Sequence, residues 1–170
     1  SELKDNVWSV PVKMGSDINT TSWETHATVS ADGEMLLFTS NRAGGFGGRD
    51  IWFCKRLPDG TWGLAQNVGG VINTQYDEES PFLGFDGRTL FFSSQGHTSM
   101  GGFDIFRSEL DNGVWQEAKN LGFPINTSED DVFFVLSADG RTAYLSSRRE
   151  GGLGETDIYS LQVEVQQADE

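Results

Sequence analysis

The chain has 170 residues, of which 26 are acidic and 12 basic, so its formal net charge is -14. Because a nucleic-acid groove needs Lys and Arg, this charge argues against DNA and RNA as partners, and also against an anionic membrane surface. The length fits one domain, and no apolar run is long enough for membrane insertion. The only cysteine, Cys54, lies in an apolar strand-like run, which predicts a buried thiol and excludes an intramolecular disulfide.

Four sequence landmarks recur three times, at spacings of 54 and then 53 residues. The first two are a dipeptide that ends in tryptophan (Val7-Trp8, Thr61-Trp62, Val114-Trp115) and an Ile-Asn-Thr segment (from Ile18, Ile72 and Ile125). The other two are an Asp-Gly pair (from Asp32, Asp86 and Asp139) and an Asp-Ile-aromatic segment (from Asp50, Asp104 and Asp157). A fixed period of this order, built from short strands, is typical of a β-propeller with one blade per repeat.

The repeats divide the chain into expected blades. We predict a single β-propeller domain over residues 1–170, whose parts follow in chain order: an N-terminal strand at 6–11, blades at approximately 12–65, 66–118 and 119–163, and a tail at 164–170. The predicted fold is all-β, with three four-stranded repeats of 53–54 residues. Propellers close with about 4–8 blades. The chain is therefore expected to be half of a six-bladed ring or part of a longer array.

The middle repeat illustrates how one blade is built. Its parts are a strand at 78–85, the Asp86-Gly87 turn, a strand at 90–94, a glycine-rich loop at 95–102, a strand at 104–108, a turn at 111–113 and a strand at 114–118. Aromatic and β-branched residues are frequent in these strands, and helical periodicity is absent from the sequence. The Asp-Gly pair predicts a hairpin in each blade, with positive φ at Gly33, Gly87 and Gly140.

Each repeat has two long connections, the glycine-rich loop and the Ile-Asn-Thr segment. Alternate connections of an antiparallel meander emerge at the same end, so both are expected on one face, and binding residues concentrate on such loops. Arginines there could pair with carboxylates or sugar hydroxyls, and apolar side chains could pack under the loops or form a contact patch. The candidate binding residues are Arg42, Phe46, Arg49, Met100, Phe103, Arg148 and Arg149.

Carboxylates also recur at fixed repeat positions. Asp50, Asp104 and Asp157 follow the glycine-rich loops, and we expect them to pin these loops by accepting backbone N–H bonds. The acidic entry to the innermost strands offers candidate metal ligands, namely Asp77, Glu78, Asp130 and Asp131. No segment matches a twelve-residue Ca²⁺ loop, so no metal and no other cofactor is predicted, and Ca²⁺ remains the alternative.

Two recurring side chains are expected at the junctions between blades. Asn19, Asn73 and Asn126 are predicted to shape the interblade turns through bonds to the backbone. The tryptophans are predicted to lie on equivalent outer strands and to pack alike between neighbouring blades; they are Trp8, Trp62 and Trp115.

The Ser-Ala-Asp-Gly motifs at 30–33 and 137–140, with the Asp-Ile-aromatic segments that follow them, carry a resemblance. Over roughly 6–163 the chain resembles the TolB-type, WD-like β-propeller repeat, although the middle repeat departs at Gly84 and Gln95-Gly96. The Trp and Ile-Asn-Thr elements resemble a longer version in envelope proteins of Bacteroidetes-type bacteria, often beside peptidoglycan-binding OmpA-like domains. The resemblance implies a non-enzymatic module that is periplasmic, outer-membrane-associated or secreted, and that binds or scaffolds protein or glycan.

The alternative function is that of a propeller hydrolase or lyase with a site at the mouth of the central channel. The residues available for its chemistry are His26, Asp77, Glu78, Glu79, Asp130 and Asp131. The sequence contains no nucleophile elbow of the Gly-x-Ser-x-Gly type, no phosphate-binding glycine loop and no zinc-type histidine spacing.

The strand count predicts an assembly. The chain begins with an unpaired strand at Val7 to Val10 and ends with a blade that lacks its fourth strand. If the first strand of one chain pairs with the last blade of another, both unpaired edges are covered, so we expect a homodimer that closes a six-bladed ring. In the alternative, Leu3 corresponds to Leu57 and Leu110 and ends a strand that begins upstream, which makes the chain part of a longer array.

Overall fold

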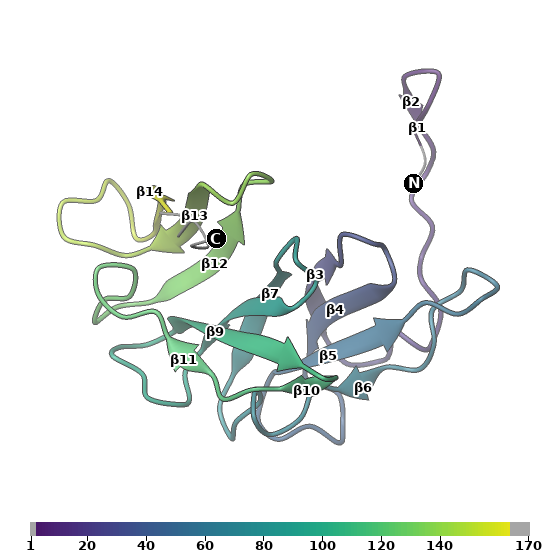
Figure 1. The fold of residues 1–170 in the computed structure, drawn as a ribbon, viewed down its shortest axis with the longest axis horizontal. Coiled ribbons are helices and arrows are strands. Elements are labelled where there is room, and N and C mark those ends of the chain that lie inside the picture. The colour runs from purple at the N-terminus through teal and green to yellow at the C-terminus, as the bar shows by residue number, and fades with distance from the viewer. Residues whose placement is uncertain (1–2, 164–170) are drawn as a thin grey trace, which may run out of the picture.

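The structure is a computed structural model that describes residues 3–163, so the predicted tail at 164–170 lies outside the described residues. All described elements are strands, which confirms the predicted all-β fold. Three antiparallel sheets follow one another in an arc, and a short N-terminal hairpin projects from one end (Figure 1). No helix of the described residues is long and apolar enough to cross a membrane.

Each sheet is one blade. The first blade contains β3 (Glu24–Val29), β4 (Met35–Ser40), β5 (Asp50–Lys55) and β6 (Gln66–Asn67). The second contains β7 (Glu78–Leu83), β8 (Thr89–Ser94), β9 (Asp104–Asp111), β10 (Val114–Trp115) and β11 (Lys119–Asn120). The third contains β12 (Asp131–Leu136), β13 (Thr142–Ser147) and β14 (Asp157–Gln162), and the hairpin contains β1 (Leu3–Lys4) and β2 (Val7–Trp8).

The prediction of one continuous outer strand at 114–118 is wrong. Two short strands, β10 and β11, pair with different parts of β9 instead. Between them the Gln116 carbonyl accepts a bond of 2.6 Å from the Ser108 hydroxyl. The Gln116 amide still donates to the Glu109 carbonyl, so the outer strand divides at the point where the Gln116 carbonyl turns to a side chain.

Apolar clusters between the blades form the core. One cluster joins the first two blades and includes Leu37, Phe92 and Phe106, and another joins the second and third through Phe91 and Phe134. The central strands β4 and β8 are buried along almost their whole length, as expected for strands covered on both faces. Cys54 is fully buried and free, as its position in an apolar strand predicted.

The Asp-Gly turns lie at the end of the blades opposite the glycine-rich loops. Gly33, Gly87 and Gly140 have φ values of 76°, 66° and 68°, which confirms the predicted positive φ. Each glycine donates its amide to the carbonyl three residues earlier. A left-handed residue at this position brings the chain back into the second strand, and glycine adopts it without steric cost.

Each innermost strand carries a β-bulge that the sequence did not indicate. The pairing register shifts within β3, β7 and β12. The bulged residues are His26, Ser80 and Phe133, whose φ values are 48°, 54° and 58°. Positive φ is uncommon for residues other than glycine, so its recurrence at one position of all three blades marks the bulge as part of the blade.

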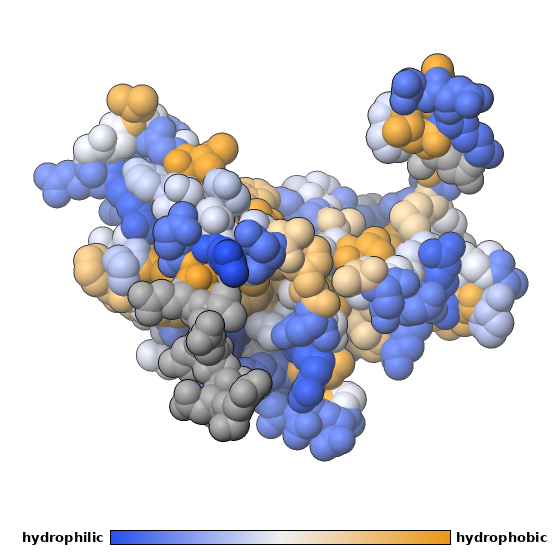
Figure 2. Space-filling view, turned by 45° about the horizontal axis from the view of Figure 1, so that its top comes forward, coloured by the Kyte–Doolittle hydropathy of each residue, from blue (hydrophilic) through white to orange (hydrophobic). Residues whose placement is uncertain are grey.

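The N-terminal hairpin is separate from the blades and stands out from the body in the space-filling view (Figure 2). Trp62 and Trp115 pack against the core, whereas Trp8 is 67% exposed. The prediction that the three tryptophans pack alike is therefore wrong for Trp8. Trp115 lies opposite Leu110 on the long strand β9, but Trp8 lies opposite Leu3 on the two-residue strand β1, which belongs to no blade.

Candidate functional site

The long connections form one face of the arc, which we call the long-loop face. It contains the glycine-rich loops at 41–49, 95–103 and 148–156 and the interblade segments at 15–23, 68–77 and 121–130. Asp50, Asp104 and Asp157 each accept a backbone N–H from the tip of the preceding loop; the bond from Leu153 to Asp157 measures 2.8 Å. The prediction that these aspartates pin the loops is confirmed.

The residue that each aspartate holds is apolar and exposed. Phe46, Met100 and Leu153 occupy the same repeat position, and their exposed fractions are 55%, 50% and 101%. We call these three residues the apolar loop tips. Because they are exposed at one repeat position of all three blades, these side chains are a candidate interaction surface. The sequence prediction contained Phe46 and Met100 but missed Leu153, which alignment of the repeats would have added.

Glycines hold the loops against the following blade. A Cβ atom on Gly47 would lie 2.0 Å from the Tyr76 carbonyl oxygen, and one on Gly101 would lie 2.5 Å from the Ser128 carbonyl carbon. No side chain fits at these distances. The loops of the first two blades are therefore packed directly on the next interblade segment, which fixes the direction of their tips.

Two of the predicted arginines hold the interblade segments in place. Arg42 donates to the Ile18 carbonyl and lies 3.2 Å from the Glu24 carboxylate. Arg149 occupies the equivalent position in the third blade and donates to the Ile125 carbonyl at 2.6 Å. Their guanidinium groups therefore satisfy groups inside the protein.

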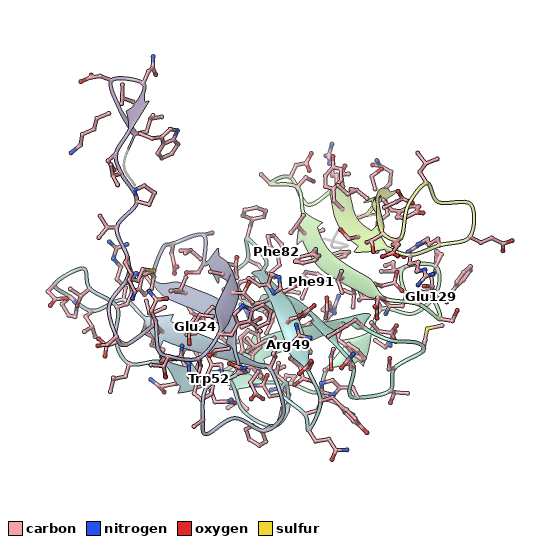
Figure 3. All side chains as sticks on the ribbon, turned by 180° about the vertical axis from the view of Figure 1, so that it is seen from behind. Glu24, Arg49, Trp52, Phe82, Phe91 and Glu129 are labelled. Atoms are coloured by element: carbon pink, nitrogen blue, oxygen red, sulfur yellow. The ribbon has the colours of Figure 1, made fainter. Side chains whose placement is uncertain are left out.

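Arg49 lies between the first and second blades (Figure 3). It forms ion pairs of 2.7 Å with Asp77 and 2.6 Å with Glu79, and its guanidinium lies over the ring of Phe103, which is buried. Burial raises the pKa of Glu79, and the Arg49 charge opposes that rise. Arg148, in contrast, is largely exposed, with Glu129 4.0 Å away. The predicted site residues that face solvent are thus Phe46, Met100 and Arg148.

The acidic entry residues accept bonds from groups of the protein. Glu78 is fully buried and accepts bonds from the Thr74 amide at 2.7 Å and from the Ser94 hydroxyl at 2.7 Å. Asp131 accepts bonds from Thr127, and Asp130 accepts the Phe103 amide at 2.8 Å. Among residues 3–163, no three His, Cys, Asp or Glu side chains are grouped so that they could hold a metal ion.

His26, the histidine of the enzyme alternative, lies in the bulge of β3. Its ring meets the edge of Phe133 with 4.8 Å between ring centres, and burial, followed by the Arg49 charge, lowers its pKa. The bulges line a cavity of about 190 Å³. Within the described part of the chain, His26 Nδ1 and Ser80 Oγ have no hydrogen-bond partner, so no hydrogen bond joins them.

No protein-family model and no curated protein matches the chain. Among solved structures, the chain is similar to one described as TolB from Agrobacterium tumefaciens, with a TM-score of 0.58 and 16% sequence identity. The similarity covers 85% of this chain and 46% of that one, so this chain spans less than half of the structure it matches. At this identity the comparison establishes a TolB-like propeller fold.

Proposed function

We propose that the protein is a non-enzymatic binding or scaffolding module of the bacterial cell envelope, and that it recognises another protein through the long-loop face. The observation that carries this proposal is the equivalence of the three apolar loop tips. Each tip is exposed, each is held by an aspartate of its own blade, and all three emerge at the same end of the blades. A series of apolar contacts at fixed spacing suits an extended partner surface.

The chemistry of the tips favours a protein over a glycan. Sugar rings bind on the flat faces of aromatic side chains, and only one of the three tips, Phe46, has such a face. Met100 and Leu153 suit apolar side chains of a partner, since thioether and aliphatic groups adapt to irregular surfaces. The net charge of -14 favours a partner with a basic rim around this contact.

The envelope location is part of the same proposal. It is supported by the TolB-like fold and by the resemblance of the repeats to envelope proteins. Fractionation of cells that make the native gene product tests it, and recovery of the protein in the cytoplasm would contradict it.

Site-specific photo-crosslinking tests the binding face. A photoreactive phenylalanine analogue at position 46, 100 or 153 should crosslink to a protein partner in intact cells. Matched controls at Glu34 and Arg88 lie on the opposite, tight-turn end of the blades. Crosslinks from both ends alike, or from the controls alone, would contradict the proposed face. Binding to purified glycans that Phe46→Ser abolishes would assign the face to a glycan instead.

Substrate turnover tests the non-enzymatic part of the proposal. The protein should not accelerate the hydrolysis of generic esterase, glycosidase and peptidase substrates. Turnover that His26→Ala abolishes would establish the hydrolase or lyase alternative.

A further inference from the structure

Residues 7–20 correspond one for one to residues 61–74 and 114–127, which connect each blade to the next. In those two segments an asparagine fastens the third strand of the preceding blade. Asn73 accepts the Ile51 amide at 2.8 Å and donates to the Ile51 carbonyl at 2.9 Å. Asn126 binds Ile105 with the same two bonds, at 2.8 and 2.9 Å. Both asparagines are completely or almost completely buried.

Asn19 occupies the same position but fastens no strand. The side-chain amide of Asn19 donates to the Met14 carbonyl, five residues earlier, at 2.9 Å. The neighbouring Ile18 is nonetheless buried in the cluster of the first blade. The segment is thus anchored on one side, and the side that holds a third strand in the other two copies is open.

The third blade has the complementary opening. Ile158 occupies the position of Ile51 and Ile105, which are fully buried, yet it is 79% exposed. Among residues 3–163, no strand pairs with the outer edge of β14. Gly154 corresponds to Gly47 and Gly101, but a Cβ atom there would meet no atom closer than 4.0 Å.

We infer that the outer edge of β14 binds residues 12–20 of a second copy of this chain, and that two such contacts close a ring of six blades. The second and third blades fix the register, which places Val12 opposite Ser160 and Lys13 opposite Tyr159. Asn19 then binds the Ile158 amide and carbonyl. Within residues 3–163 the two openings cannot meet, because the N-terminal arm and β14 lie at opposite ends of the arc (Figure 1).

The hairpin must adjust for this contact to form. Trp8 lies opposite Leu3, and Trp115 lies opposite Leu110, whose equivalent in the third blade is Val163. In the dimer, Val163 of the second copy takes the place of Leu3 opposite Trp8. This exchange covers a tryptophan that is two-thirds exposed in the single chain.

One pair of facing residues at the proposed junction differs from the equivalent pairs at the two inner junctions. Both residues of the pair are of another type there. Gly48 faces Asp77 and Gly102 faces Asp130 so closely that a Cβ atom would lie 2.3 or 2.1 Å from the carboxylate. The third blade has Glu155 in place of the glycine. The residue that would face it is Trp23, which has no carboxylate and therefore neither repels Glu155 nor requires a glycine.

Disulfide trapping tests the contact and its register. Residues opposite each other in an antiparallel ladder have Cα atoms about 4.5–5.5 Å apart, which suits a disulfide. Val12→Cys combined with Ser160→Cys should give a covalent dimer of twice the 18.7 kDa chain mass under oxidising conditions. Val12→Cys combined with Tyr159→Cys is the matched control, because neighbouring strand residues point to opposite faces. Cys54 is buried and remains in both variants.

Each outcome of the disulfide trapping either supports or overturns the proposed contact. A covalent dimer from the first pair and little from the second supports the proposal. An intrachain disulfide at monomer mass, a ladder of larger species, or equal trapping by both pairs would overturn it.

Light scattering of the unmodified chain gives a second measurement. The chain should have twice its monomer mass, and Asn19→Ala should raise the dimer dissociation constant by about tenfold or more, because it leaves the Ile158 groups unpaired. Arg88→Ala, an exposed change on the tight-turn end, should leave the mass unchanged. A monomer mass at every concentration would also overturn the proposal.

Discussion

At the scale of single residues, one asparagine per junction replaces a stretch of backbone ladder. Asn73 and Asn126 bind both polar groups of an isoleucine on the preceding blade and also bind the side chains of Asn67 and Asn120. These groups are buried, so a junction without its asparagine would leave an amide and a carbonyl unpaired. The same side chain at position 19 has no such role within one chain.

We expect Asn73→Ala to lower the free energy of unfolding by about 2–4 kcal/mol, because two buried backbone groups lose their partners. Asn19→Ala, measured under conditions where the chain is monomeric, should cost less than about 1 kcal/mol, because its bond to Met14 is exposed. Urea denaturation followed by circular dichroism measures both. Equal losses of unfolding free energy in the two variants would show that the hydrogen bonds between Asn73 and Ile51 do not stabilise the junction.

The glutamates at the start of the innermost strands should respond to pH in opposite directions. Burial raises the pKa of Glu78 above the ordinary value of 4.5 despite bonds from Thr74 and Ser94. For Glu24 burial acts in the same direction but is outweighed by bonds from Thr20 and Ser40 and by the Arg42 charge, so its pKa is lowered. The equivalent position thus disfavours the charged carboxylate in one blade and favours it in another.

Two glutamine variants test this difference. Glu78 contributes to the free energy of unfolding at low pH, and this contribution is lost as the pH rises through its raised pKa. The free energy of unfolding should therefore fall less steeply above pH 4.5 in Glu78→Gln than in the unmodified chain. Stability from Glu24 is present above its unfolded pKa and is lost as the pH falls, so Glu24→Gln should destabilise at neutral pH and lose this effect in acid. Thermal denaturation over a pH series measures both, and parallel curves for the two variants would contradict the assignment.

At the scale of elements, one glycine position in the glycine-rich loops depends on contact with the next blade rather than on positive φ. Gly47, Gly101 and Gly154 are equivalent, and none of them has positive φ. The first two have no room for a side chain, whereas the third has room because no described blade follows it. The same loop sequence therefore meets a different constraint at the end of the arc.

Alanine substitutions should separate these cases. Gly47→Ala and Gly101→Ala should each destabilise by about 1–3 kcal/mol, because a methyl group must displace the neighbouring backbone. Gly154→Ala should leave the monomer unchanged or slightly more stable. Thermal unfolding compares the three variants, and a similar loss from Gly154→Ala would contradict the proposed cause.

The turn glycines respond to a different constraint. Gly33, Gly87 and Gly140 have open space around the position of a Cβ atom but have positive φ. Replacement of any one by Val should cost roughly 1 kcal/mol or more, since a β-branched residue fits this conformation poorly. Unchanged thermal stability in all three variants would exclude the backbone as the reason for glycine here.

At the scale of the whole molecule, the three blades form an arc with two different ends. Each inner junction buries apolar side chains from two blades, but β14 alternates between partly buried and exposed residues along its length. Repeat proteins of this kind are stabilised mainly by contacts between neighbouring units. The terminal blade should therefore open more readily than the middle blade.

Hydrogen exchange should report this gradient. The Ile158 amide should exchange faster than the equivalent amides of Ile51 and Ile105, which donate to buried asparagines. Its exchange should slow at high protein concentration if the second copy covers β14. Equal rates at all three isoleucines in dilute protein would show that the free edge is already protected.

The sequence by itself determined the features that repeat. Four landmarks in one register predict the blade count, the all-β fold, the positive φ of the turn glycines and the pinning aspartates, because each depends on contacts within one blade or on the local backbone. Phe46 and Met100 were found for the same reason, as apolar residues in loops that had to lie at the surface.

The tertiary structure alone decided what happens between blades. Arg42, Arg49 and Arg149 looked available for a ligand, but their partners come from residues far away in the sequence or from the next blade. The bulges at His26, Ser80 and Phe133 share no residue type, since a pairing shift rather than a side chain requires them. Trp8 and Asn19 have the same sequence context as their equivalents, but no blade strand of the described chain lies beside them, so Trp8 is exposed and the Asn19 side chain binds Met14 instead.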